Sequence, residues 1–167
     1  MANSYQNIAM PGMRVDASLF NVDGCNAAQG KIYPGFVVAK VSVTTTERVV
    51  KQVAASADAS TAMGICHFSH DGCVKGFYDD KDPVNVVTFG RTWTVTTLTG
   101  APTPDAVVNV LTSGDDAGKV SNTGGTAIPG WTFTGEYTVF QDYAGKETYL
   151  AAVQVRNQTA ASSTTNP

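Results

Sequence analysis

Residues 84–98 read VNVVTFGRTWTVTTL, and this stretch decides the fold class. From residue 87 onward the side chains alternate between two faces. One face collects Val87, Phe89, Trp93 and Val95, and the other collects Thr88, Gly90, Thr92, Thr94 and Thr96. A period of two with β-branched and aromatic residues predicts a half-buried strand. The alternation slips before residue 87, which predicts a bulge or burial of both faces, and Gly90 predicts a bend or a close backbone approach.

Arg91 interrupts the apolar face of this predicted strand. Charged side chains in such positions are normally paired, so one interpretation places Arg91 at the end of a barrel beside an acidic residue. The other interpretation makes it a contact between subunits, because arginine is enriched at protein interfaces. The sequence leaves both interpretations open.

The composition favours an all-β fold. Valine outnumbers leucine 21 to 4 among the 167 residues, and 21 threonines and 16 glycines accompany it. Leucine is among the best helix formers, whereas valine and threonine favour strands. A chain of this length forms one domain with a substantial core. We therefore predict a compact β-barrel or β-sandwich, of jelly-roll or tulip-like form, with an extended N-terminal arm and a polar C-terminal tail.

Charge and hydropathy exclude two classes of partner. The formal net charge is −3 and no basic run is present, so we expect no nucleic acid partner. No apolar stretch approaches the roughly 20 residues of a membrane-spanning helix, so we expect no membrane partner. The first residues lack the basic start and apolar middle of a signal peptide, which predicts synthesis in a cytoplasm. Three cysteines, an odd number, do not form a disulfide framework.

The chain divides into three predicted parts. Residues 1–30 show no sustained period of two or 3.6 and contain the breaker MPGM at residues 10–13, so they are predicted to be an arm. Residues 31–156 form the predicted β domain. Residues 157–167, NQTAASSTTNP, form the predicted polar tail. An arm without a core of its own requires a partner to offset the entropy lost on ordering.

Within the β domain, alternating runs bounded by Gly, Pro, Asn and Asp predict a series of strands. The predicted strands cover residues 37–43, 49–53, 63–68, 84–98, 107–111, 131–139 and 149–155, with an interruption near Gly135 and a short return at 119–121. Residues 54–61 predict a loop or one helical turn, 69–76 a hairpin tip and 122–130 a loop. This pattern fits a closed barrel and a two-sheet jelly roll equally well.

One constellation has the composition of a metal site. Cys66, His70 and Cys73 supply three candidate ligands, with His67 or Asp71 as a fourth. The spacing is not that of a standard zinc knuckle, and neighbouring residues of a strand point to opposite faces. We therefore expect no metal and no cofactor. A reversible disulfide between Cys66 and Cys73 is disfavoured in a reducing cytoplasm.

The sequence lacks the motifs of catalysis. Both histidines lie in that one hairpin, and no nucleophile elbow, phosphate-binding loop or dinucleotide fingerprint is present. A catalytic site needs a nucleophile, a base and an orienting group that converge, and no such set is indicated. We expect a protein that is not an enzyme.

Five stretches of the sequence carry a resemblance. They are MPGM at 10–13 with Val15 and Asp16, Gly30 with PGFVV at 34–38, AMGI at 62–65, KDPVNVVTFGRTW at 81–93 and YLAAVQVR at 149–156. Together they resemble the capsid cement (decoration) proteins of tailed bacteriophages, in which an arm with a Pro-Gly step precedes a compact β domain. The resemblance spans most of residues 10–156. The chain departs from the family pattern at the Cys/His hairpin and after Arg156.

The resemblance implies a structural role. Such proteins bind the outer surface of an expanded icosahedral head and bridge neighbouring major capsid protein subunits. The implied partners are the major capsid protein and further copies of this chain, as a homotrimer in preference to a dimer. The implied location is the outer surface of the virion. The arm is the expected contact, by strand addition or groove filling, with Met10, Pro11 and Met13 as apolar anchors. The alternative is that the Pro-Gly step turns the arm back onto its own domain.

Two other functions compete with this interpretation. A carbohydrate- or receptor-binding module of a phage fibre needs exposed aromatic side chains, but Trp93 and Trp131 lie on apolar faces, which favours core packing. A head–tail connector subunit forms rings. Under the cement interpretation, we expect deletion of residues 1–30 to leave a folded β domain that no longer binds heads.

Overall fold

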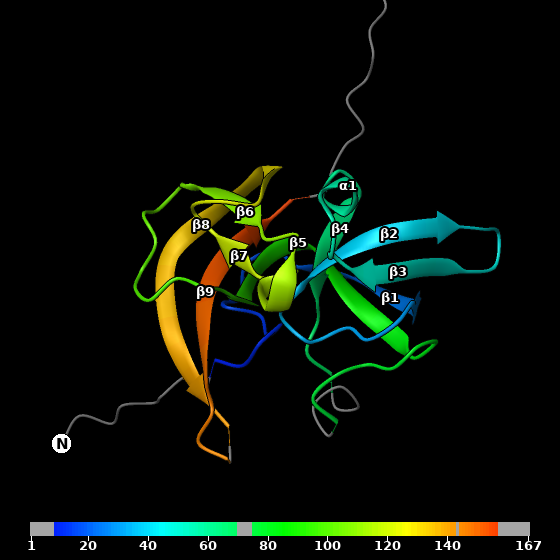
Figure 1. Ribbon diagram of the computed structural model, residues 1–167, viewed down its shortest axis with the longest axis horizontal. Coiled ribbons are helices and arrows are strands. Elements are labelled where there is room, and N and C mark those ends of the chain that lie inside the picture. Colours follow the sequence, from blue (N-terminus) through cyan, green and yellow to red (C-terminus); the bar gives the residue numbers. More distant parts are fainter. Residues whose placement is uncertain (1–8, 70–74, 143, 157–167) are drawn as a thin grey trace, which may run out of the picture.

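The computed structural model describes residues 9–69, 75–142 and 144–156, in which β-strands dominate (Figure 1). In chain order the elements are β1 (Asn21–Ala28), β2 (Val37–Val43), β3 (Arg48–Gln52), α1 (Ser56–Ala59), β4 (Ala62–Cys66), β5 (Pro83–Val95), β6 (Val107–Val110), the 3-10 turn η1 (Gly114–Asp116), β7 (Val120–Ser121), β8 (Thr126–Gln141) and β9 (Glu147–Val155). The predicted all-β class is confirmed. In this part of the chain no helix is long and apolar enough to cross a membrane.

Five strands close into a barrel in the order β1-β3-β2-β4-β5, because β5 pairs back with β1. Only the β1–β3 pair is parallel; the other pairs are antiparallel. Every one of these strands contributes to one buried cluster. That cluster contains Ala28, Ile32, Val38, Val50, Cys66, Tyr78, Val84 and Val86. The barrel interior is therefore filled by side chains.

A second sheet continues from β5 in the order β5-β9-β8-β6-β7. A larger core lies between this sheet and the barrel, since it combines residues of β2, β4 and β5 with residues of β6 to β9. Trp131 and Phe133 are its largest fully buried side chains, and the indole N–H of Trp131 donates to the carbonyl of Arg156 at 2.8 Å. The predicted core role of Trp131 is confirmed.

Strand β5 belongs to both sheets, and it bends where they meet. Its first half pairs with β1 and β4, and from Gly90 onward it pairs with β9. Gly90 has a φ of 118°, and a Cβ there would lie 2.6 Å from a ring carbon of Phe20. The predicted bend and close approach are confirmed. Both Val86 and Val87 are fully buried, so burial of both faces accounts for the slip in the alternation.

The threonine face of β5 is buried along its length, whereas on the expected apolar face only Val87 and Val95 are buried. Thr88, Thr92, Thr94 and Thr96 are buried, whereas Phe89 and Arg91 are exposed and Trp93 is half-buried. Hydrogen bonds of the threonine hydroxyls make this possible: Thr88 accepts from the side-chain amide of Asn21 at 2.7 Å, and the other three donate to backbone carbonyls. Thr92 donates to Met13 at 3.0 Å and Thr96 to Val120 at 2.7 Å. A threonine with its hydroxyl satisfied packs as a small β-branched side chain.

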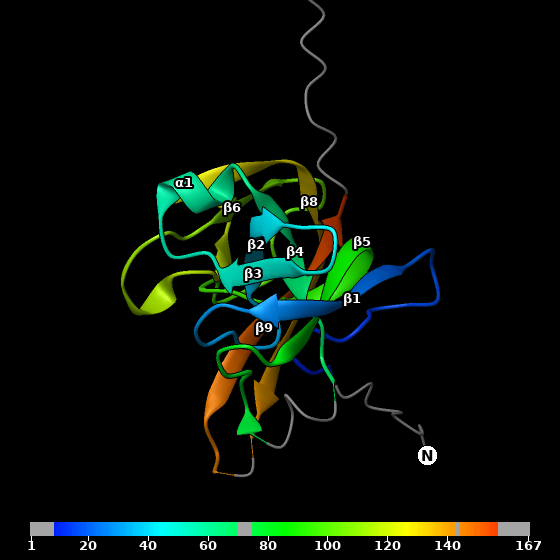
Figure 2. The same ribbon diagram turned by 90° about the vertical axis from the view of Figure 1, so that its right-hand side faces the viewer.

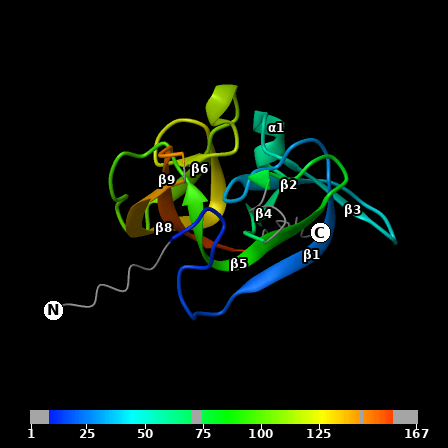
Figure 3. The ribbon, with the colours of Figure 1, turned by 90° about the horizontal axis from the view of Figure 1, so that it is seen from below.

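The prediction that residues 1–30 contain no element is wrong for residues 21–28. These residues form β1, which lies beside β5 and closes the barrel (Figure 3). The strand has no apolar alternation in its sequence, because a buried position is occupied by Asn26. The side-chain amide of Asn26 donates to the carbonyls of Asp23 and Val84, at 2.9 and 3.1 Å. The ladder with β5 also shifts between Asp23 and Asn26. Deletion of residues 1–30 would thus remove a barrel strand.

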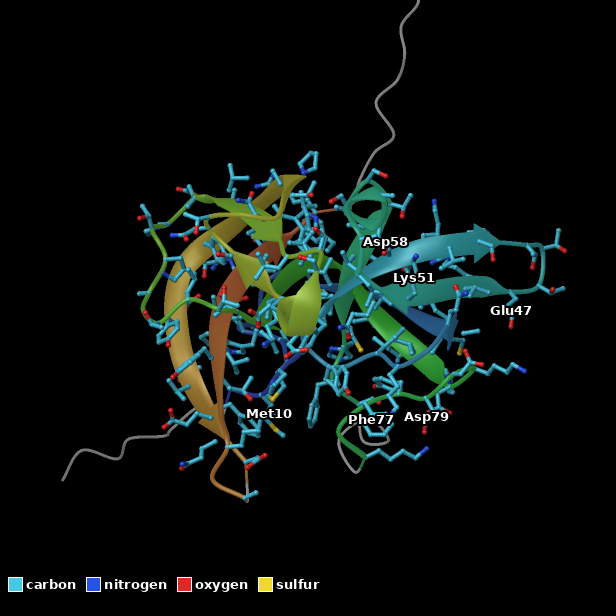
Figure 4. The ribbon with its side chains drawn as sticks, in the orientation of Figure 1. Met10, Glu47, Lys51, Asp58, Phe77 and Asp79 are labelled. Carbon is cyan, nitrogen blue, oxygen red and sulfur yellow. The ribbon has the colours of Figure 1, made fainter. Side chains whose placement is uncertain are left out.

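The remaining predicted strands are confirmed with shifts at their ends. The helical turn expected in residues 54–61 is α1, which lies at one end of the molecule (Figure 2). Asp58 fixes it by pairing with Lys51 of β3 at 2.7 Å (Figure 4). The loop predicted for 122–130 is wrong in its second half, because β8 begins at Thr126. The expected interruption near Gly135 is confirmed as a register shift between Phe133 and Tyr137.

Candidate functional site

The first described residues of the predicted arm lie on the molecule itself. The backbone of residues 12–15 runs along the edge of β5, forming an antiparallel bridge between Arg14 and Thr92. The amide of Gly12 donates to the carbonyl of Trp93 at 2.7 Å, and the amide of Trp93 donates to Met13 at 2.8 Å. The amide of Val15 donates to Arg91 at 3.0 Å. This segment therefore acts as a short additional strand beside the second half of β5.

The Pro11-Gly12 step forms a tight turn that is packed into the domain. The amide of Met13 donates to the carbonyl of Met10 at 3.0 Å, and Gly12 has a φ of 79°. A Cβ at Gly12 would lie 2.4 Å from the carbonyl oxygen of Cys66. The second Pro-Gly step packs against the first, since a Cβ at Gly35 would lie 2.8 Å from the Cβ of Pro11. Neither glycine tolerates a side chain.

The three predicted anchors lie at the turn around Pro11 and Gly12. Met10, Pro11 and Met13 are half-buried, and Met10 lies on the side of the molecule toward which the β8–β9 ribbon projects (Figure 4). Ala9 packs beside them against Val95 and Leu150. In the structure, residues 9–15 pack against their own domain. This is the alternative that the sequence left open, in which the Pro-Gly step turns the arm back. Contact of the exposed parts of these side chains with a shell stays a prediction.

Arg91 is paired with an acidic residue, as the first interpretation expects. Its Nη1 lies 3.0 Å from Oδ2 of Asp16, and both side chains are substantially exposed. Hydrogen bonds from Ser18, together with the Arg91 guanidinium, hold the pKa of the Asp16 carboxyl below its usual range. The pair ties the arm to the outer face of β5. Its exposure leaves Arg91 free to contact a second subunit, which stays a prediction.

Residues 14–20 form a compact loop that sequence reasoning missed. The Arg14 guanidinium donates to the carbonyls of Asp16 and Ser18, the latter at 2.7 Å, and lies 5.3 Å from the centroid of the Phe20 ring. These contacts fix the loop and leave Leu19 82% exposed. The only sequence signal was the apolar pair Leu19-Phe20 after a polar stretch, and it has no periodicity.

The Cys/His constellation is not assembled by the described residues. Cys66 is buried at the end of β4, where desolvation raises the pKa of its thiol, and it serves as a core residue. His70, Asp71 and Cys73 lie outside the described residues. Within the described ranges no three Cys, His, Asp or Glu side chains cluster as metal ligands. Nδ1 of His67 instead lies 2.9 Å from the carbonyl oxygen of Gly12, so this side chain holds the arm.

Comparison with known families finds a match along almost the whole chain. The family described as structural cement protein (E217 gp24/Pam3 gp6) matches residues 2–160. The chain belongs to this family. Membership gives the cement protein a structural role in a phage capsid, association with the capsid shell and a place in the virion. The family's role is non-enzymatic.

The solved structures agree with this fold. A chain from the structure titled "The capsid of Myoviridae Phage XM1" superposes on the cement protein with a TM-score of 0.62. The two sequences are 20% identical, and the match covers 93% of this chain and 97% of the other. The shared architecture thus includes both sheets. No curated protein sequence matches the cement protein significantly.

Proposed function

We propose that this protein binds the outer surface of an expanded phage head and bridges neighbouring major capsid protein subunits, without catalysing a reaction. The observation that carries the proposal is the family match over residues 2–160, which includes the arm as well as both sheets. The mildly acidic chain, with a net charge of −3, suits an outer surface better than one that faces packaged DNA. Synthesis takes place in the cytoplasm of the bacterial host.

The fold is suited to a bridging protein that carries tension between capsid subunits. The barrel and the second sheet share β5 and the larger core, so force applied at one end is transmitted through paired strands to the other. A bridging protein needs little affinity at each contact, because symmetry repeats the contact many times over the head. The proposed contacts with the shell or with further copies are Met10, Pro11, Met13 and Arg91, and the exposed Leu19 is a further candidate.

Co-sedimentation with expanded heads that lack this protein tests the proposal. We expect saturable binding of the full chain, with heads that survive higher temperature once they are coated. A Met10→Ser, Met13→Ser double variant that stays folded by circular dichroism should bind more weakly. Absence of binding by the full chain at micromolar concentration would refute the proposal and favour a fibre module or a connector subunit.

Self-association and position are separate parts of the proposal. We propose a homotrimer, with Arg91 at the contact between copies, and light scattering of the purified protein measures its mass. A monomer whose mass does not change with concentration would contradict that part alone. Antibody labelling of intact heads tests the outer location, since a protein on the inner surface would stay unlabelled.

A further inference from the structure

Strand β8 has an edge that no described strand covers. β9 pairs with one side of β8 as far as Gln141. On the other side, the ladder with β6 ends at Thr132, Phe133 then bonds to Asp105 and Ala106, and Gly135 approaches Pro104. Beyond this point the strand continues along the outside of the molecule as part of the β8–β9 ribbon (Figure 1). Residues 137–141 therefore form an open edge within the described structure.

The register shows which backbone groups face this edge. The carbonyl of Tyr149 accepts the amide of Thr96 at 3.0 Å, so it points toward β5 and away from β8. Val139 lies opposite Tyr149 in the antiparallel ladder, so the two form a pair without mutual hydrogen bonds. Val139 consequently directs its own N–H and C=O outward. By alternation, Tyr137 and Gln141 do the same.

Among the described residues, this edge lacks the usual protection. Exposed edges are normally blunted by proline, lysine, a bulge or a covering loop. Residues 137–141 read YTVFQ, the register shift ends at Tyr137, and the next turn begins only at Asp142. The open length is about 17 Å. The adjoining sheet face is apolar: Val139 is 43% exposed, Tyr149 is 36% exposed, and the Tyr137 and Tyr149 rings lie 6.4 Å apart.

Charge distinguishes between the possible occupants. Glu136 and Asp142 flank the edge along the chain, Glu147 lies opposite Gln141 in the ladder, and Lys146 is the one cation in residues 136–147. Antiparallel pairing of two copies with the largest overlap would centre on Val139 and place Glu136 of one copy opposite Asp142 of the other. That like-charge contact is unfavourable. A strand from a different protein, neutral or basic at its ends, meets no such repulsion.

We infer that the open edge of β8 takes up an extended segment of the major capsid protein by strand addition. This inference rests on the proposed function and names the element that holds the shell. Backbone hydrogen bonds to Tyr137, Val139 and Gln141 provide the attachment, and the Tyr137/Val139/Tyr149 face selects the side chains of the incoming segment. Residues 137–141 are already paired with β9, so most of the ordering on binding falls to the incoming segment.

The variant Val139→Pro isolates the backbone contribution. Proline removes the outward N–H of residue 139 without removing a hydrogen bond to β9, and proline is tolerated on the solvent side of an edge strand. We expect Val139→Pro to weaken co-sedimentation with heads roughly tenfold, through loss of a bond and of backbone fit. Val139→Thr keeps the N–H and the branched shape, and should bind within about threefold of the unchanged protein. Equal binding by all three proteins would overturn the inference while leaving the cement function intact.

Hydrogen exchange identifies the occupant. In the free protein the amides of Tyr137, Val139 and Gln141 should exchange fast, and binding to heads should slow them at least tenfold. Slowing that rises with protein concentration in the absence of heads would show a second copy at the edge and overturn the inference. Slow exchange in free, dilute protein that becomes fast on deletion of residues 1–8 would show the chain's own N-terminus there, with the same consequence. Failure of the unchanged protein to bind heads would count against the proposed function itself.

Discussion

Two edges of the second sheet differ in whether the described chain covers them. Residues 12–15 cover the edge of β5 through backbone bonds of Gly12, Met13 and Val15 to Arg91 and Trp93. The edge of β8 at residues 137–141 has no such cover among the described residues. The covered edge of β5 therefore belongs to the fold. Strand addition, one of the two contacts that the resemblance implies for the arm, is available at the edge of β8.

Deletion of residues 1–30 should have the largest effect on this contrast. The deletion removes β1 as well as the strand that covers β5, so the barrel opens between β3 and β5. We expect no cooperative unfolding transition and no dispersed amide spectrum. A deletion that ends at Ile8 removes none of the described contacts and should keep the fold. A cooperative transition in the longer deletion would show that the barrel does not depend on β1.

Gly12→Ala should be the most damaging single substitution at the covered edge. A Cβ there would meet the Cys66 carbonyl at 2.4 Å, on a residue whose φ is 79°. Gly30→Ala is the matched control, because Gly30 has a φ of 72° and nothing within 4 Å of its added Cβ. We expect losses of about 3 kcal/mol or more for Gly12→Ala and about 1 kcal/mol for Gly30→Ala in urea unfolding. Equal losses of unfolding free energy in the two variants would mean that the Pro11-Gly12 turn can shift to accommodate a Cβ without destabilising the protein.

The elements that could be predicted from sequence share a clear local signal. Strand β5 has a period of two, and the two Pro-Gly steps, at Pro11 and Pro34, mark turns by their φ requirements alone. The all-β class follows from the ratio of valine to leucine. These features depend on residues close together in the chain, so one sequence is enough to show them.

The features that were missed depend on distant partners. β1 has no hydrophobic period, because one of its buried residues is the polar Asn26. The side-chain amide of Asn26 can be buried since it donates to the carbonyl of Val84, 58 residues away. The buried threonine face of β5 depends on carbonyls of Met13 and Val120. The exposure of Leu19 depends on the loop conformation, which the hydrogen bond from Arg14 to the carbonyl of Ser18 stabilises. The open edge of β8 is a property of the strand order, which no local pattern specifies.

Leu19→Ser tests whether the loop over the covered edge contacts a partner through its side chain. Leu19 is 82% exposed, so we expect a change in unfolding free energy within about 0.5 kcal/mol. The affinity of the variant for each binding site on the head should fall a few-fold. Val107→Ser, at a valine that is 56% exposed on β6, is the control and should bind normally. Equal weakening by both substitutions would point to a general loss of surface hydrophobicity and not to a contact at Leu19.

The pH dependence of stability should show the smallest effect, through His67. Burial lowers the pKa of this imidazole, against the opposing influence of its bond to the Gly12 carbonyl. In the unfolded chain a histidine titrates near pH 6.5. As the pH falls from 7.5 to 5, the unfolded state binds a proton that the folded state resists, so the free energy of unfolding should decrease.

Two variants assign this dependence to the covered edge. His67→Asn places an amide N–H near the position of Nδ1, so it keeps a donor for the Gly12 carbonyl and should remove the decrease between pH 7.5 and 5. His70→Asn replaces the only other histidine and should leave the decrease unchanged. The lowered pKa of Asp16 does not interfere, because its contribution is lost only as the pH falls below about 4. A decrease that persists in His67→Asn but vanishes in His70→Asn would mean that the contact between His67 and the arm does not respond to pH, and that the covered edge stays closed under acidic conditions.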